Sequence, residues 1–308
     1  MRLIREEVVA PAALTSNVAI TETAWTPGTY TLGQQRYIGT DLYEVVADPS
    51  TADDPRVGVL PKPVPPVNGE AQPDLPPTWV RIGKINRWRM FSEFVAEKTV
   101  RASPLQVEIA TSPRVNAVAL FGLEAAAVEI VTYSGGEETG RVSKAMTNVM
   151  EVSNWYEYFF QEIIKIEEGV ILDLPSYGTD RLVIRVTNDD APVAIGKVVI
   201  GQQVELGKTR LGYSAGIEDF SLKERDDFGG WKVTERRFAK RAEFSVILNA
   251  GRFAAVMRDL AAVRARPTVF IGDPASPETI VIGFYKDAWA TRSTREIAEM
   301  TLEIEGLT

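Results

Sequence analysis

The chain has 308 residues, of which 45% are hydrophobic and 25% charged, and its formal net charge is −8. This composition is typical of a folded soluble protein of two or three domains, and the negative charge argues against a nucleic-acid partner. Because cysteine and histidine are absent, disulfides, cysteine metal sites and histidine-dependent nucleophilic catalysis are excluded. Carboxylate, lysine and oxygen-ligand metal chemistry remain open.

Residues 1–19 predict an extended N-terminal arm. Leu3, Val8, Val9 and Val18 are suited to adding a strand to another sheet, although their periodicity is poor. Charged residues interrupt the first 14 positions, MRLIREEVVAPAAL, so they lack the apolar core of a signal peptide. No run approaches the roughly 18 apolar residues of a membrane helix. We therefore expect synthesis and folding in a cytoplasm, without membrane insertion.

Residues 20–84 predict a small β module rich in aromatic residues. Glycines separate very short strands, among them a hairpin of Tyr37-Ile38 and Leu42–Val46 around Gly39. A proline-rich insert, residues 53–77, is expected to be an extended or polyproline-like loop. The aromatic rings either stack on sugars or form the core of a module that has no disulfide. The candidate carbohydrate-binding residues are Trp25, Tyr30, Tyr37, Tyr43 and Trp79.

The segment 78–91, TWVRIGKINRWRMF, lies where the module ends and a series of strands begins. If its last six residues are extended, Trp88 and Met90 point to one side and Arg89 to the other. The two apolar side chains then anchor the junction in the core of the next domain. The predicted junction residues are Asn86, Arg87, Trp88, Met90 and Phe91.

Residues 85–216 show short runs of strand-like alternation at regular spacing, separated by turn residues. This pattern predicts a β-sandwich of jelly-roll type. The expected strands are Leu105–Ala110, Asn116–Phe121, Ala127–Tyr133, Trp155–Ile166, Val170–Leu174, Leu182–Thr187 and Val193–Ile200.

Residues 217–308 predict a small α+β domain. Trp231–Leu248 reads as one long strand, and an apolar stripe predicts a helix over Arg252–Arg266, with Asn249 as a cap. Further strands are expected at Thr268–Gly272, Thr279–Tyr285 and Ile297–Ile304. The predicted fold class is therefore mainly β, with a small module, a sandwich and a C-terminal α+β domain.

Two charged segments of this last domain have competing interpretations. Glu218–Asp227 gathers carboxylates, but it lacks the loop spacing of an EF-hand, which favours a solvated turn or a subunit contact. Arg236–Arg241 is suited to phosphate or to acidic neighbours, and the acidic chain favours intersubunit pairing or solvation. No phosphate loop, metal-ligand spacing or nucleophile motif occurs. We therefore expect no enzymatic activity, no cofactor and no metal.

The aromatic module is similar to small chitin-binding-type carbohydrate-binding modules, and the proline-rich insert is its departure from their pattern. The residues that match those modules are Trp25, Tyr30, Gly33, Gly39, Tyr43 and Trp79. The segments that follow are Asn86–Phe91, Trp155–Phe160, Ala194–Gly201, Gly216–Gly229 and Glu305–Leu307. This order of motifs resembles a family of tailed-phage tail-tip or baseplate structural proteins.

This resemblance implies a structural component of a virion tail. The C-terminal domain and the N-terminal arm are expected to dock onto other tail or baseplate proteins, and the module to contact host-surface glycan. Copies would associate with three- or six-fold symmetry, since closed rings come from cyclic symmetry. The alternatives are a free-standing carbohydrate-binding protein and a carboxylate-based glycan depolymerase.

Overall fold

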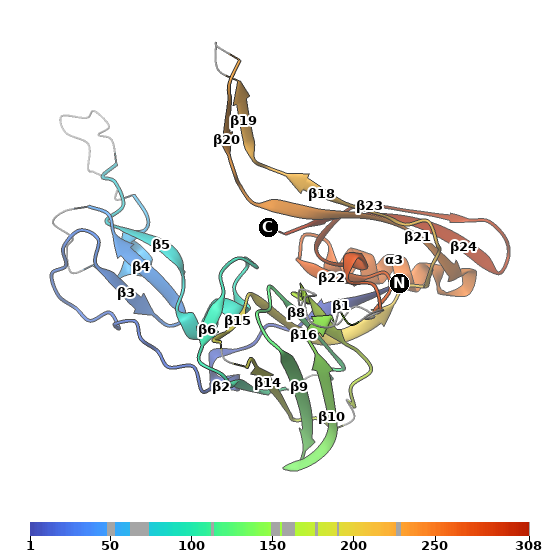
Figure 1. Ribbon diagram of the computed structural model, residues 1–308, viewed down its shortest axis with the longest axis horizontal. Coiled ribbons are helices and arrows are strands. Elements are labelled where there is room, and N and C mark those ends of the chain that lie inside the picture. Colours follow the sequence, from blue (N-terminus) through green and yellow to red (C-terminus); the bar gives the residue numbers. More distant parts are fainter. Residues whose placement is uncertain are drawn as a thin grey trace, which may run out of the picture.

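Strands dominate the protein, which confirms the predicted mainly β, sandwich-like class. In Figure 1 the aromatic module lies at one end and the C-terminal strands at the other, with the sandwich between them. Within the described residues, no helix is both long and apolar enough to span a membrane. The computed structural model describes residues 1–47, 53–61, 74–111, 114–148, 155, 164–175, 178–189, 191–225 and 229–307.

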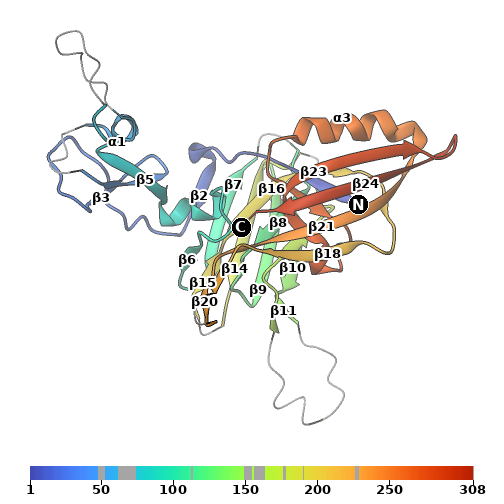
Figure 2. The same cartoon turned by 90° about the horizontal axis from the view of Figure 1, so that it is seen from above.

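One curled antiparallel sheet runs through most of the molecule (Figure 2). Within the described residues it has ten strands, in the order β13-β8-β16-β1-β22-β23-β24-β21-β17, and β18 also pairs with β21. The strands are β13 (Gly169–Ile171), β8 (Ala117–Phe121), β16 (Lys197–Glu205), β1 (Arg2–Glu6), β22 (Thr268–Ile271), β23 (Ile280–Arg292), β24 (Ile297–Gly306), β21 (Phe238–Asn249), β17 (Lys208–Thr209) and β18 (Ser214–Asp219).

A second antiparallel sheet, β10-β9-β14-β7-β2, packs against the β13-β8-β16 end of the large sheet. Alternate residues of both sheets meet in the sandwich core; in β7 these are Leu105, Val107 and Ile109. This is the period-2 pattern of a half-buried strand. The strands of this sheet are β10 (Glu137–Ala145), β9 (Ala127–Ser134), β14 (Arg181–Thr187), β7 (Leu105–Ala110) and β2 (Leu14–Ser16).

The other end of the large sheet is covered by α3 (Phe253–Val263), which buries Val256, Leu260 and Val263. Facing it, β24 buries the row of alternate residues that the sequence predicts, Ala298, Met300, Leu302 and Ile304. The Asn249 side chain caps the short 3-10 helix η3 (Ala250–Arg252) before α3 and accepts a hydrogen bond from the Gly251 amide at 2.8 Å. The predicted helix is thus confirmed, with shorter ends.

Strand β1 is a central strand of the large sheet, paired on both sides, and not a free arm. Leu3 lies opposite Val204 of β16 and Phe270 of β22, and its side chain is buried in the core under α3. Ile4 points to the opposite face and joins a separate apolar cluster. β1 approaches β16 so closely that a Cβ at Gly201 would lie 1.9 Å from the Arg5 carbonyl oxygen. The expectation that the segment around Leu3 adds a strand to a sheet is therefore confirmed, whereas the expected external arm is wrong for Arg2–Glu6, which lie inside the body.

The aromatic module is built on the sheet β3-β4-β5. The predicted hairpin is confirmed: β3 (Gln35–Ile38) and β4 (Asp41–Val45) meet at Gly39, whose φ of 63° suits glycine in a tight turn. In the insert, Pro55–Gly58 forms a helical turn, α1, packed on β5 (Trp79–Lys84) instead of the expected extended loop. Most of the remaining insert, residues 62–73, lies outside the described residues.

Several strands differ from the sequence prediction. β10, β18 and β19 (Leu222–Arg225) were not expected, and their residues are mostly exposed. The long strand expected over Trp231–Leu248 is divided into β20 (Trp231–Thr234) and β21. Most of the strand expected at Trp155–Ile166 lies outside the described residues. The remaining short elements are η1 (Pro11–Ala13), β6 (Thr99–Arg101), β11 (Thr147–Asn148), β12 (Ile164–Lys165), β15 (Val193–Ile195) and η4 (Pro277–Thr279).

Removing the Leu3 side chain should destabilise the whole body. We expect Leu3→Ala to lower the free energy of unfolding by about 2–5 kcal/mol, because it leaves a cavity in a fully buried site. Val8→Ala, at a highly exposed position of the same segment, should change it by less than about 0.5 kcal/mol. Urea unfolding followed by circular dichroism measures both. Equal effects of the two substitutions would contradict the central position of β1.

Candidate functional site

The predicted carbohydrate-binding rings are mostly core residues of the module. Trp79 is 0% exposed, and Tyr30 and Tyr43 are also buried, in one cluster with the half-buried Trp25. The Tyr30 and Trp79 rings meet edge to face, with their centroids 5.4 Å apart. A sugar needs a free ring face for stacking, so the proposed sugar contact of Trp79, Tyr30 and Tyr43 is corrected to a role in the core.

Tyr37 lies on the opposite face of the module sheet from this cluster. It packs beside Leu42, Ile85 and Trp88, where the module meets the sandwich. Trp25 and Tyr37, the two half-buried candidates, therefore belong to different clusters. The five predicted rings do not form one continuous aromatic platform.

The junction segment Asn86–Phe91 is a 3-10 helix, η2, and not the extended segment expected. Residues two apart in a 3-10 helix point in different directions, because each residue turns the chain by about 120°. Trp88 accordingly packs in the module-side cluster with Leu42 and Ile85, while Met90 is buried in the sandwich core. The half-buried Phe91 contacts both clusters. The segment thus joins two cores.

Hydrogen bonds fix η2 to β6. The Thr99 hydroxyl accepts from the Met90 amide at 2.8 Å and donates to the Asn86 carbonyl at 2.7 Å. The Asn86 side chain bonds both backbone groups of Val100, at 2.9 and 3.0 Å. Arg87 donates from Nε to the Val18 carbonyl at 2.7 Å. The junction residues are therefore engaged within the chain and serve to position the module.

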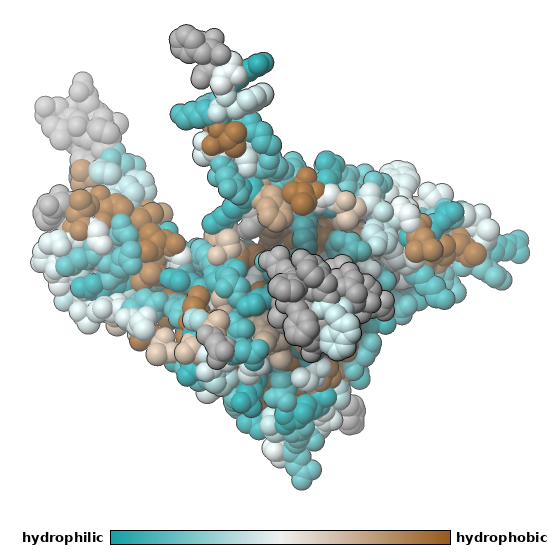
Figure 3. Space-filling model, viewed as in Figure 1, coloured by the Kyte–Doolittle hydropathy of each residue, from teal (hydrophilic) through white to brown (hydrophobic). Residues whose placement is uncertain are grey.

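A different feature, the hairpin of β19 and β20, projects from the body (Figure 1). Every residue of its two strands is exposed, including Trp231 at 67%. Trp231 and Val233 share one face with Lys223 and Arg225, since these residues pair across the strands. Figure 3 shows apolar atoms on this hairpin surrounded by hydrophilic ones. The Gly229-Gly230 pair lies between β19 and β20 and is a turn signal that would have indicated a hairpin here.

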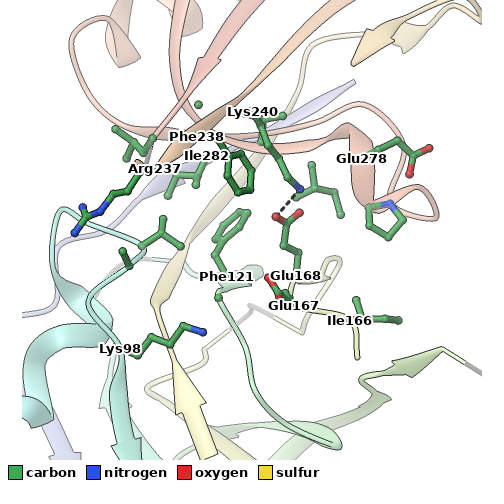
Figure 4. A pocket seen from close by; sticks show the side chains of 18 of the residues that line it. Lys98, Phe121, Ile166, Glu167, Glu168, Arg237, Phe238, Lys240, Glu278 and Ile282 are labelled. Atoms are coloured by element: carbon green, nitrogen blue, oxygen red, sulfur yellow. Dashed lines mark hydrogen bonds and ion pairs between the residues drawn. The ribbon is translucent and has the colours of Figure 1, made fainter. Parts of the chain in front are cut away.

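An apolar cavity of about 650 Å³ lies at the root of the same hairpin, between the sandwich and the C-terminal strands. In Figure 4, Phe121 and Phe238 face it, and Lys240 reaches Glu168 on its wall. The Lys240 ammonium donates to Glu168 Oε1 at 2.5 Å. Glu168 Oε2 is buried without a hydrogen-bond partner among the described residues. Burial raises the pKa of the Glu168 carboxyl, and the Lys240 charge opposes this shift.

Some side chains of the two charged segments are paired within the chain. Asp219, in β18, accepts from Lys223 at 2.8 Å. The described part of the acidic stretch lies mostly in β18 and β19 instead of the expected solvated turn, and the alternative of a subunit contact stays a prediction. Of the basic segment, Lys240 pairs with Glu168, and Arg241 pairs with Glu303. In the part of the chain that the structure describes, no group of three or more acidic side chains is arranged to hold a metal ion.

Comparison with known proteins yields no match to a family model, to a curated protein or to a solved structure. The functional assignment therefore depends on the site itself. One feature of the site is the projecting hairpin with its exposed apolar residues. The other is an apolar cavity lined in part by Glu168, whose Oε2 has no hydrogen-bond partner among the described residues.

The Thr99 hydroxyl should contribute strongly to the junction. We expect Thr99→Val to lower the free energy of unfolding by about 2–3 kcal/mol, because the Met90 amide and the Asn86 carbonyl both lose their buried partner. Thr301→Val, on the exposed face of β24, serves as control and should change stability by less than about 0.5 kcal/mol. Thermal unfolding of both variants tests this.

Trp79→Ala should destabilise the module instead of only weakening sugar binding. The expected loss is about 3–5 kcal/mol, which is typical of truncating a large buried aromatic side chain. Hydrogen exchange of residues 35–45 would show faster exchange in this variant. A normally protected module that has lost glycan affinity would contradict the core assignment of Trp79.

Proposed function

We propose that this protein is a structural component of a bacteriophage tail tip or baseplate, and that it acts by assembling with neighbouring subunits. The observation that carries this proposal is the projecting β19–β20 hairpin. It exposes Trp231 and Val233, and within the described residues it is a separate two-stranded sheet. An isolated two-stranded hairpin is marginally stable in water and gains stability when a partner covers it.

The architecture of the body agrees with this role. An assembled particle requires subunits whose parts keep a fixed arrangement, and the large sheet links the sandwich to the C-terminal strands through β1. The module is joined to the sandwich by η2 with its buried Trp88 and Met90.

Contact with host-surface glycan is a secondary part of the proposal. It rests on the module's resemblance to chitin-binding-type modules, and the half-buried Trp25 and Tyr37 are the rings left to serve it.

The proposal predicts that the chain is found in intact tails. Phage particles produced with a tagged chain should contain it at one end of the tail, as seen by electron microscopy with an antibody against the tag. The double variant Trp231→Ser and Val233→Thr should fold but be depleted from particles by about tenfold or more, since buried aromatic anchors dominate most interfaces.

Val142→Thr, an exposed position on β10, provides the matched control and should be incorporated normally. Absence of the unmodified chain from intact tails would overturn the proposed function. Isolated chain that cleaves glycan, or that binds it tightly as a free monomer, would favour one of the two alternatives.

A further inference from the structure

The part of the large sheet that α3 covers has a second, open face. α3 packs on one side of β21, β23 and β24, and alternate side chains of these strands point to the other side (Figure 1). Trp289 of β23 lies on this open face, opposite Thr301, and is 73% exposed. Arg241 and Lys208 point to the same side. The carboxylates of the open face are Glu243, Asp287, Glu299, Glu303 and Glu305.

Three of these carboxylates lie side by side across the strands. Glu303 of β24 is in register with Asp287 of β23 on one side and with Glu243 of β21 on the other. Like charges directly opposite each other in a sheet are destabilising. Arg241 and Lys286 both pair with the central carboxylate, Glu303. Within the described residues, Glu243 and Asp287 have no ion pair. A cationic surface would therefore stabilise the open face by covering it.

The outer surface of α3 carries the opposite charge. Arg258 lies on its exposed side between Ala254 and Ala261, at the spacing of one helical face. The carboxylate of the helix, Asp259, is engaged by Arg5 at 3.2 Å. In the part of the chain that the structure describes, Arg258 has no ion pair, and the same holds for the two exposed arginines after the helix, Arg264 and Arg266.

We propose that α3 of one copy packs on the open face of the next copy, with Arg258 on the Trp289 ring and the arginines after the helix beside the carboxylates. A guanidinium stacks on an indole ring, and its planar set of donors also suits carboxylates. The 11 residues of α3 span about 16 Å, and the stretch Glu299–Glu305 of β24 spans about 20 Å, so the two surfaces have similar lengths.

The charge complementarity of these two surfaces points to a second copy as the occupant. A helix on the open face would also repeat the helix-on-sheet packing that the same strands already make with their own α3. Contact between two open faces is disfavoured, because it would bring carboxylates together. A helix-to-face contact joins two different surfaces, so it is head-to-tail and propagates from copy to copy into a ring or a filament. This inference rests on the proposed function and specifies how copies associate.

Charge reversal at the two surfaces tests the contact in the full chain. The helix variant carries Arg258→Glu and Arg266→Glu, and the face variant carries Glu243→Arg and Asp287→Arg. In analytical ultracentrifugation the unmodified chain should self-associate. Each variant alone should associate about 100-fold more weakly, because like charges then meet at the contact. An equimolar mixture of the two variants should regain the association, since each reversed surface meets its complement.

Trp289→Ser should weaken the association by about tenfold, because it removes the ring on which Arg258 stacks. Two matched controls change a similarly exposed ring and an exposed carboxylate elsewhere on the surface. These are Trp231→Ser on the hairpin and Glu137→Arg on β10, and both should leave the association unchanged. Circular dichroism verifies that each variant is folded.

Two outcomes would overturn the inference. One is association that the reversed charges leave unchanged, or that mixing the two variants does not restore. The other is an unmodified chain that stays monomeric at every concentration tested. Both leave the proposed function open, since a tail protein can be held by other subunits. Absence of the chain from intact tails would overturn the proposed function, whether or not purified copies associate.

Discussion

The structure depends on the pairing of β1 between β16 and β22. These partner strands are distant in sequence, and only the N-terminal residues join them. Successive side chains of a strand point to opposite faces, so Leu3 completes the core under α3 while Ile4 completes the cluster on the other face. A single short strand thus connects the sandwich and the C-terminal strands into one sheet. Separating them would require breaking backbone hydrogen bonds and exposing both apolar side chains.

A second short segment, η2, fixes the module to the sandwich. η2 places Trp88 and Met90 in two different cores because a 3-10 helix turns their side chains apart. The Thr99 hydroxyl bonds two backbone groups of η2, and the Asn86 side chain bonds β6. The module is therefore attached through buried contacts on both sides, and not through a flexible linker. This attachment suits the proposed role in assembly, since the position of each surface is defined before partners meet.

The sequence predicted elements with one buried face and failed where both faces are exposed. β24 was predicted because Ala298, Met300, Leu302 and Ile304 alternate with polar residues. β10 and β19 lack such a buried row, so periodicity could not find them, and it could not find the break between β20 and β21. The candidate site was missed for a different reason. Glu168 is far in the sequence from Phe238, with which it lines the cavity, and the exposure of Trp231 and Phe238 follows from the fold alone.

The aromatic residues of the module are mostly buried, so the module is a less suitable binding surface than the sequence predicted. A unit of this size buries a small fraction of its surface and needs its largest side chains for a core. Trp79, Tyr30 and Tyr43 meet that need. The hairpin differs from the module, because it leaves Trp231 67% exposed. An exposed indole on a projecting element gains free energy only when another surface covers it.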